Sequence, residues 1–172
     1  MNNKKIAGVV LAGGRSSRMG QDKALLDYNG QSLLDHMIEL LKQVGLDDVY
    51  VSGDFKGYRS ISDSTPHEGP AYAMHDVLQH LSGVDGVLFV PVDTPLLNAQ
   101  ILHLLIQQEK GAYFAEHPLP AFITGRCLEW RSKSVKEFLS KMKLCPLILP
   151  SEFEKCMVNS NTPEEWQEVL RA

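Results

Sequence analysis

A glycine-rich loop carrying cationic residues follows the first apolar segment of the chain. It runs from Leu11 to Lys23 and reads LAGGRSSRMGQDK. Glycines let the backbone approach an anion closely, and successive backbone N–H groups can enclose it. The side chains of Arg15, Arg18 and Lys23 can then neutralise phosphate oxygens. The loop predicts a phosphate-binding site, with a structural turn as the alternative interpretation.

This loop follows neither of the two common phosphate-binding patterns. A P-loop needs Gly, four residues and then Gly-Lys-Ser/Thr, whereas five residues separate Gly14 from Gly20 and Lys23 comes three positions later. The adjacent Gly13 and Gly14 do not supply the Gly-x-Gly-x-x-Gly pattern of a dinucleotide-binding fold. The loop therefore indicates a phosphate site of another class.

Two aspartates follow apolar segments that are typical of strands. Asp93 comes directly after the apolar run 87–92, and Asp63 follows a candidate strand at 58–62. A carboxylate at such a strand end can hold Mg²⁺, which binds one or two carboxylates together with substrate phosphates. Asp93 is therefore the candidate metal ligand. A turn or helix-capping role is the alternative interpretation of both side chains.

The elements that must position these residues are visible in the spacing of apolar side chains. Continuous apolar runs at 6–11 and 87–92, and a shorter one at 49–51, predict strands buried on both faces. Apolar residues at helical spacing, preceded by capping residues, predict helices at 32–44, at 69–81, from 98 to about 110 with Gly111 after it, from 134, and from 162.

The second half of the chain gives weaker strand signals. Residues 112–115 and 121–124 are predicted strands around a proline-rich bend at 117–120, and short strands are predicted at 147–149 and 156–158. Strands alternate with helices throughout, which favours an α/β fold with a mostly parallel sheet. Because ligands bind beyond the carboxyl ends of the strands in such a sheet, we expect the glycine-rich loop and the two aspartates at one edge.

Composition restricts the function classes. The chain has 172 residues, which predicts one domain, 1–172, and a net charge of −4, with +3 concentrated in residues 1–31. The acidic balance argues against nucleic-acid binding, and no segment is apolar enough to predict a membrane span or a secretory signal. The chain has three cysteines, Cys127, Cys145 and Cys156, and their spacing matches no zinc-binding pattern. We therefore expect reduced thiols and a cytoplasmic location.

Three motifs together resemble a known family. They are the loop LAGGRSSRMGQDKALL from Leu11, the strand end DTPLL from Asp93, and the late segment NSNTPEE from Asn159. Together they are similar to the molybdenum cofactor guanylyltransferases, within the nucleotidyltransferases of the glycosyltransferase-A-like group. The resemblance covers residues 6–165 and implies a single-domain, three-layer α/β/α, Rossmann-like and mostly parallel sheet.

The resemblance implies a role for each matching position. Lys23 and Arg18 match the phosphate-facing cations, and Asp93 matches an aspartate that binds nucleotide and Mg²⁺; these three are the candidate catalytic residues. The nucleotide site would comprise Leu11, Ala12, Gly13, Gly14, Arg15, Lys23, Ser52, Asp63, Gly69 and Asp93. The side facing the second substrate would comprise His117, Pro118, Asn159 and Asn161.

The implied reaction is metal-dependent transfer of GMP from GTP to the molybdenum cofactor, molybdopterin, with release of pyrophosphate. Ser52 stands where the family often has Asn, and Ala73 where it often has a second Gly, so a sister enzyme using CTP stays open. A sister enzyme with a sugar-phosphate acceptor also stays open, as does a non-catalytic nucleotide-binding scaffold in cofactor delivery. Expected partners are GTP, the molybdenum cofactor and proteins that deliver or accept it, with no nucleic acid and no membrane.

One charged segment has two interpretations. Residues 126–143 carry a net charge of +4. A solvated helix face is the default interpretation of such a run. The sharper hypothesis is an electrostatic collar for an anionic substrate or for a protein that accepts the cofactor.

Overall fold

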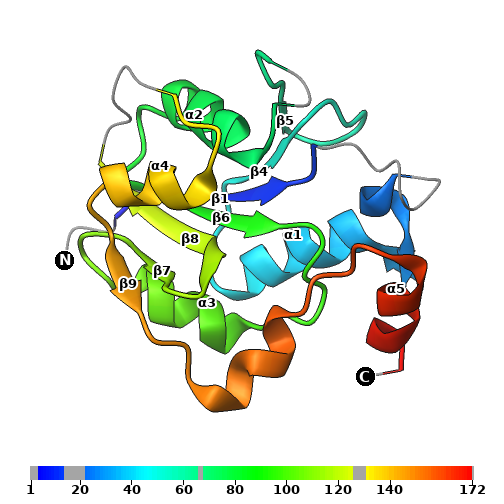
Figure 1. Ribbon diagram of the computed structural model, residues 1–172. Coiled ribbons are helices and arrows are strands. Elements are labelled where there is room, and N and C mark those ends of the chain that lie inside the picture. Colours follow the sequence, from blue (N-terminus) through cyan, green and yellow to red (C-terminus); the bar gives the residue numbers. More distant parts are fainter. Residues whose placement is uncertain (1–3, 14–21, 66–67, 126–130, 172) are drawn as a thin grey trace.

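A seven-stranded sheet with helices on both faces forms the centre of the protein (Figure 1). The computed structural model describes residues 4–13, 22–65, 68–125 and 131–171. The strand order is β5-β4-β1-β6-β8-β7-β9, and β8 runs antiparallel to its neighbours β6 and β7. The other ladders of this sheet are parallel, and its strands are β1 (Ile6–Leu11), β4 (Val49–Ser52), β5 (Ser60–Ile61), β6 (Gly86–Pro91), β7 (Ala112–Phe114), β8 (His117–Thr124) and β9 (Cys145–Leu147).

Two separate apolar cores hold the helices against the sheet. One core includes residues of α1 (Leu33–Gln43), α3 (Ala99–Ile106) and α5 (Pro163–Val169), and the other includes residues of α2 (Pro70–His80) and α4 (Val135–Lys141). In β1, Val10 joins the first core whereas Val9 joins the second, because successive strand side chains point to opposite faces. The predicted three-layer α/β/α, mostly parallel fold is therefore confirmed.

Capping residues start the predicted helices as expected. The side chains of Ser32, Asn98, Ser134 and Thr162 each accept a backbone N–H of the first helical turn. Such a bond satisfies one of the donors that have no partner within the helix. At Thr162 the side chain of Glu165 returns to the backbone of the cap, and Pro163 occupies the first helical position.

A short hairpin connects the glycine-rich loop to α1, and the sequence analysis missed it. Strands β2 (Asp27–Tyr28) and β3 (Gln31–Ser32) pair antiparallel around Asn29 and Gly30, whose φ angles are 55° and 85°. An Asn-Gly pair is the preferred sequence for a two-residue hairpin turn that needs positive φ at both positions. The signal was therefore present in the sequence.

The helix predicted from 98 to about 110 is shorter than expected. It ends at Ile106, and Gly111 leads into β7 instead of terminating the helix. Gly111 has a φ of 77°, and a Cβ atom there would lie 2.6 Å from the carbonyl oxygen of Phe122. Close approach to β8 therefore explains this glycine, and the prediction that it directly follows the end of the helix is wrong.

Three predictions in the second half of the chain are wrong. The proline-rich stretch 117–120 is part of β8 rather than a bend. Proline has no backbone N–H to donate to a neighbouring strand, and β8 tolerates its prolines because β6 pairs only with residues 121–124. Strand β9 lies two residues earlier than predicted. The predicted strand 156–158 falls at the end of a 3-10 helix, η2 (Ser151–Met157), from which Phe153 and Met157 pack against the α1–α3 core.

Two further expectations concern location. No helix in the described part of the chain is long and apolar enough to cross a membrane. Cys145 and Cys156 are free thiols, as predicted, and Cys127 lies outside the described residues.

Candidate active site

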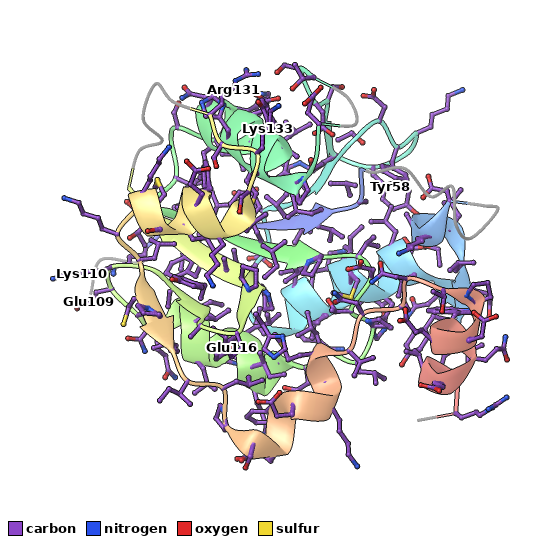
Figure 2. The ribbon with its side chains drawn as sticks, in the orientation of Figure 1. Tyr58, Glu109, Lys110, Glu116, Arg131 and Lys133 are labelled. Atoms are coloured by element: carbon purple, nitrogen blue, oxygen red, sulfur yellow. The ribbon has the colours of Figure 1, made fainter. Side chains whose placement is uncertain are left out.

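A cavity of about 480 Å³ opens beyond the carboxyl ends of β1 and β6. This is the edge at which ligands are expected in a parallel α/β sheet. The cavity brings together eight of the predicted residues, namely Leu11, Ala12, Gly13, Lys23, Asp93, His117, Pro118 and Asn159. The other lining residues were not among the predicted site residues, and they are Pro70, Pro91, Val92, Glu116, Leu119, Val135 and Met157. Figure 2 shows Glu116 near the start of β8.

The backbone at the end of β1 is fixed by its neighbours on both sides. The amides of Ala12 and Gly13 donate to the Ser52 carbonyl at 3.4 and 3.0 Å, and the Val92 amide donates to the Leu11 carbonyl at 3.2 Å. These bonds extend the sheet past the last residue pairs of the β1 ladders. Leu11, Ala12 and Gly13 therefore form a rigid backbone wall of the cavity.

Gly13 touches the aspartate that follows β5. A Cβ atom at Gly13 would lie 2.8 Å from Oδ2 of Asp63, closer than side chains tolerate. The other carboxylate oxygen of Asp63 accepts the hydroxyl of Ser52, which is fully buried, at 2.9 Å. Ser52 and Asp63 therefore adjoin the Gly13 backbone, and a larger residue at position 13 would require the Asp63 carboxylate or the backbone to shift.

Lys23 and Asp93 meet at the cavity. Lys23 opens a short 3-10 helix, η1 (Lys23–Leu25), which Asp22 caps by accepting the Ala24 amide at 3.1 Å. Its ammonium nitrogen lies 3.9 Å from Oδ2 of Asp93 and donates to Oδ1 of Asn161 at 2.7 Å. The structure thus joins three predicted residues that lie far apart in the sequence.

Burial dominates the electrostatics of Asp93. Loss of solvent raises the pKa of its carboxyl group, and the nearby Lys23 charge opposes that rise without cancelling it. Desolvation penalises the charged form of a carboxyl group. Within the described residues, no cluster of three or more His, Cys, Asp or Glu could hold a metal by itself.

The C-terminal segment contacts both Lys23 and Asp93. Ser160 donates its backbone N–H and its hydroxyl to the carbonyl oxygen of Asp93 at 2.8 and 3.3 Å, and Ser160 is fully buried. The amide of Asn161 donates to Oε2 of Glu165 at 2.6 Å, which fixes the residue whose side chain holds Lys23. Ser160 was missed, because nothing local in its sequence indicates a bond across 67 residues.

The predicted second-substrate residues divide into two groups. His117, Pro118 and Asn159 line the cavity, whereas the Asn161 side chain binds Lys23. Nε2 of His117 lies 3.5 Å from a carboxylate oxygen of Glu154 in η2. Asn161 is therefore placed between the two halves of the site.

The remaining predicted residues lie at the margin or outside the description. Gly69 is the residue before α2, with a φ of 101°, and its neighbour Pro70 lines the cavity. Gly14, Arg15 and Arg18 lie outside the described residues.

The fold is shared with solved structures, one of which is named a nucleotidyl transferase. A nucleotidyl transferase from Methanothermobacter thermautotrophicus superposes with a TM-score of 0.76 and 15% identity, over 99% of this chain and 97% of that one. A Mycobacterium tuberculosis protein in complex with manganese superposes with a TM-score of 0.65 and 16% identity, over 98% and 99% of the two chains. The chain thus shares the α/β fold of these structures over almost its whole length.

Sequence comparison narrows this fold to a family. Residues 8–138 match the model of the MobA-like NTP transferase domain. A molybdenum cofactor guanylyltransferase of Xanthomonas euvesicatoria is 37% identical over an alignment 182 positions long, which covers 95% of this chain and 93% of that protein. The chain belongs to the MobA-like NTP transferase family.

Proposed function

We propose that this protein is a molybdenum cofactor guanylyltransferase that transfers GMP from GTP to molybdopterin and releases pyrophosphate. The observation that carries the proposal is the meeting of Lys23 and Asp93, 3.9 Å apart, beside the rigid backbone of Leu11 to Gly13. A cation and a carboxylate beside backbone that lines a cavity can hold a metal-bound triphosphate. The named relative, which aligns over almost its whole length, supplies the choice of base and acceptor.

We assign nucleotide binding to the half of the site that lies at the ends of the parallel strands. We assign the backbone of Leu11, Ala12 and Gly13 to the nucleoside, with Ser52 and Asp63 behind it and Gly69 at the start of α2. Lys23 faces the phosphates. Arg15, Arg18 and Gly14 receive the same assignment from their place in the loop.

Asp93 fits a magnesium ion. It offers one carboxylate at a cavity, and Mg²⁺ characteristically takes one or two carboxylates and completes its shell with water and substrate phosphates. Such an ion would neutralise phosphate charge and orient the α- and β-phosphates for in-line displacement. Ser160 donates to the carbonyl oxygen of Asp93 and so fixes the backbone from which the Asp93 carboxylate projects.

The residues of the chain act by positioning and charge. The terminal phosphate of molybdopterin is an anion at neutral pH, since its second pKa is about 6. It attacks the α-phosphorus of GTP, the bond to the β-phosphate oxygen breaks, and pyrophosphate leaves with the electron pair. No general base is needed. Lys23 offsets the charge that collects on the leaving pyrophosphate, and such preorganised charge stabilisation is typically the largest catalytic term.

The acceptor binds on the other side of the cavity. We assign His117, Pro118 and Asn159 to molybdopterin, and Asn161 to the boundary between the two substrates. Reduced cysteines fit a cytoplasmic enzyme, and proteins that deliver or accept the cofactor are its expected partners.

Pyrophosphate release with a panel of nucleotides tests the proposal. Purified enzyme would receive Mg²⁺, molybdopterin loaded with molybdate, and each of GTP, CTP, ATP and UTP in turn. We expect release with GTP alone, and we expect EDTA to abolish it. Release with CTP alone would show a cytidylyltransferase with the same fold and mechanism. Nucleotide binding without turnover would instead favour the scaffold role.

A further inference from the structure

A polar cluster outside the cavity is centred on Asp76 of α2. One carboxylate oxygen of Asp76 accepts the backbone N–H and the hydroxyl of Ser64 at 2.8 and 2.7 Å. Its other oxygen accepts Nη2 of Arg131 at 3.1 Å and lies 3.4 Å from Nδ1 of His75. The side chain of Asp76 is only 11% exposed, and that of Arg131 is 39% exposed.

Arg131 has further contacts to the same segments. Its Nη2 lies 3.2 Å from the hydroxyl of Ser64, and its guanidinium carbon lies 5.8 Å from the ring centroid of Tyr72 in α2. Figure 2 shows Arg131 beside α2, on the chain that leads into α4. The cluster therefore ties three segments together, namely the loop after β5, the helix α2 and the entry to α4.

Each tied segment leads to a wall of the cavity. Ser64 directly follows Asp63, whose carboxylate receives the Ser52 hydroxyl and touches the Gly13 backbone. Arg131 stands four residues before Val135, which lines the cavity at the start of α4. A shift of Ser64 would carry Asp63 with it, because adjacent residues share a rigid peptide unit.

We propose that Asp76 is a positioning residue for the nucleotide half of the site: it fixes Ser64 and Arg131, and through them Asp63 and the start of α4. The inference rests on the proposed function, because it takes Asp63 and Gly13 to adjoin the bound nucleotide. It also changes the interpretation of the basic segment 126–143. Arg131 acts through Asp76 in this scheme, and not as part of a collar for an anionic substrate.

The charge state of Asp76 supports this role. Burial raises the pKa of its carboxyl group, but the hydrogen bonds from Ser64 and His75 and the Arg131 charge outweigh burial and lower that pKa overall. The group is therefore ionised at neutral pH, and an ionised carboxylate makes stronger hydrogen bonds to Ser64 than a neutral one would.

The test compares Asp76→Ala with Asp76→Asn in the full chain. Asparagine keeps an acceptor for the Ser64 amide but loses the ion pair with Arg131. The control is Asp48→Ala, which breaks an Asp–Arg pair of the same length, 3.1 Å to Arg59, in the loop before β4. The readouts are the Kd of a non-hydrolysable GTP analogue with Mg²⁺ by calorimetry, KM and kcat by pyrophosphate release, and the thermal midpoint.

We expect Asp76→Ala to raise the Kd and the KM for GTP about tenfold and to leave kcat within about twofold. Asp76→Asn should restore part of the loss, and Asp48→Ala should match the wild type. Unchanged Kd and KM in Asp76→Ala would overturn the proposal. So would a parallel fall of kcat, nucleotide affinity and thermal midpoint in both Asp76 variants, because that pattern indicates a structural role alone.

Failure of the proposed function looks different. A wild-type enzyme that binds or uses another nucleoside triphosphate contradicts the choice of GTP. The same variants are then compared with the triphosphate that binds, and the expected ratio between Asp76→Ala and the wild type is the same. A wild type that binds no nucleoside triphosphate overturns both.

Discussion

The two sides of the cavity are held in different ways. The wall made by Leu11, Ala12 and Gly13 continues the parallel sheet, and backbone hydrogen bonds to Ser52 and Val92 fix it. The opposite side comes from the start of the antiparallel strand β8 and from residues 157–161 near the C-terminus. There the connection to Lys23 and Asp93 is made by the side chain of Asn161 and by Ser160.

This difference indicates how each side tolerates change. A backbone wall is insensitive to most side-chain substitutions but cannot accept added atoms where the chain packs closely. On the C-terminal side, the contact of Lys23 with Asn161 is a single side-chain hydrogen bond, and such a bond makes a modest net contribution of about 1 kcal/mol. Substitutions on the two sides should therefore differ in size and kind, and the following experiments sharpen or break that contrast.

The largest effect is expected where the two sides meet. Lys23→Ala should lower kcat about 10²- to 10³-fold, because loss of one preorganised group that stabilises transition-state charge typically costs that much. Lys110→Ala is the control, since Lys110 is exposed in the turn before β7 (Figure 2). Steady-state pyrophosphate release measures both variants. Turnover at the wild-type rate in Lys23→Ala would remove Lys23 from the mechanism.

A large effect on nucleotide binding is expected from one methyl group in the backbone wall. In Gly13→Ala the new Cβ would lie 2.8 Å from Oδ2 of Asp63, so the wall or the aspartate must shift. We expect the affinity for GTP to fall at least about tenfold, equivalent to about 1.4 kcal/mol. Gly83→Ala is a matched control, because nothing lies within 4 Å of the Cβ position there. Equal affinities in calorimetry would show that the wall is more adaptable than its contacts indicate.

A smaller effect is expected on the C-terminal side. Asn161→Ala removes the acceptor 2.7 Å from the Lys23 ammonium, while the backbone bond from residue 161 to Glu165 can persist. We expect kcat/KM to fall about threefold, the usual size for one hydrogen bond. Asn161→Asp keeps an acceptor oxygen and should orient Lys23 as the wild type does. A loss as large as that of Lys23→Ala would mean that Asn161 itself contacts a substrate.

The smallest effect concerns stability and pH. Burial raises the pKa of Asp93 above its ordinary value of 3.8, so the folded state binds more protons than the unfolded state between the two values. Stability therefore falls as the pH rises through that window, and the ionised Asp93 costs stability at neutral pH. We expect Asp93→Asn to be more stable than the wild type at pH about 7, with the difference shrinking as the pH falls through that window toward 3.8.

Urea unfolding of Asp93→Asn and the wild type, at pH about 7 and again below pH 3.8, measures this difference in stability. A wild type that is more stable than Asp93→Asn at neutral pH would show that the Lys23 charge outweighs burial.

Much of the nucleotide side could be predicted from the sequence. Apolar runs identified β1 and β6 because both strands are buried on both faces, and parallel strands bring their carboxyl ends to one edge. That rule alone placed Gly13 and Asp93 at the same cavity. The Asn-Gly hairpin at Asn29 was also available from the sequence, although it was not used.

The C-terminal side could not be predicted in the same way. Two prolines in 117–120 suggested a bend, yet they lie in β8 beyond its ladder with β6. The segment 156–158 was predicted as a strand, although Phe153 and Met157 have helical spacing and pack as part of η2. In both places short local signals compete, and packing against the finished sheet decides between them.

The sequence by itself determined the α/β class, the order of most elements and the loop and aspartate at the sheet edge. These follow from periodicity and capping, which act over a few neighbouring residues. Only the tertiary structure decided that Asn161 holds Lys23 across 138 residues, that Ser160 holds Asp93, and that Asp76 joins Ser64 to Arg131. Such contacts depend on which surfaces meet when the layers pack, and no local pattern encodes that meeting.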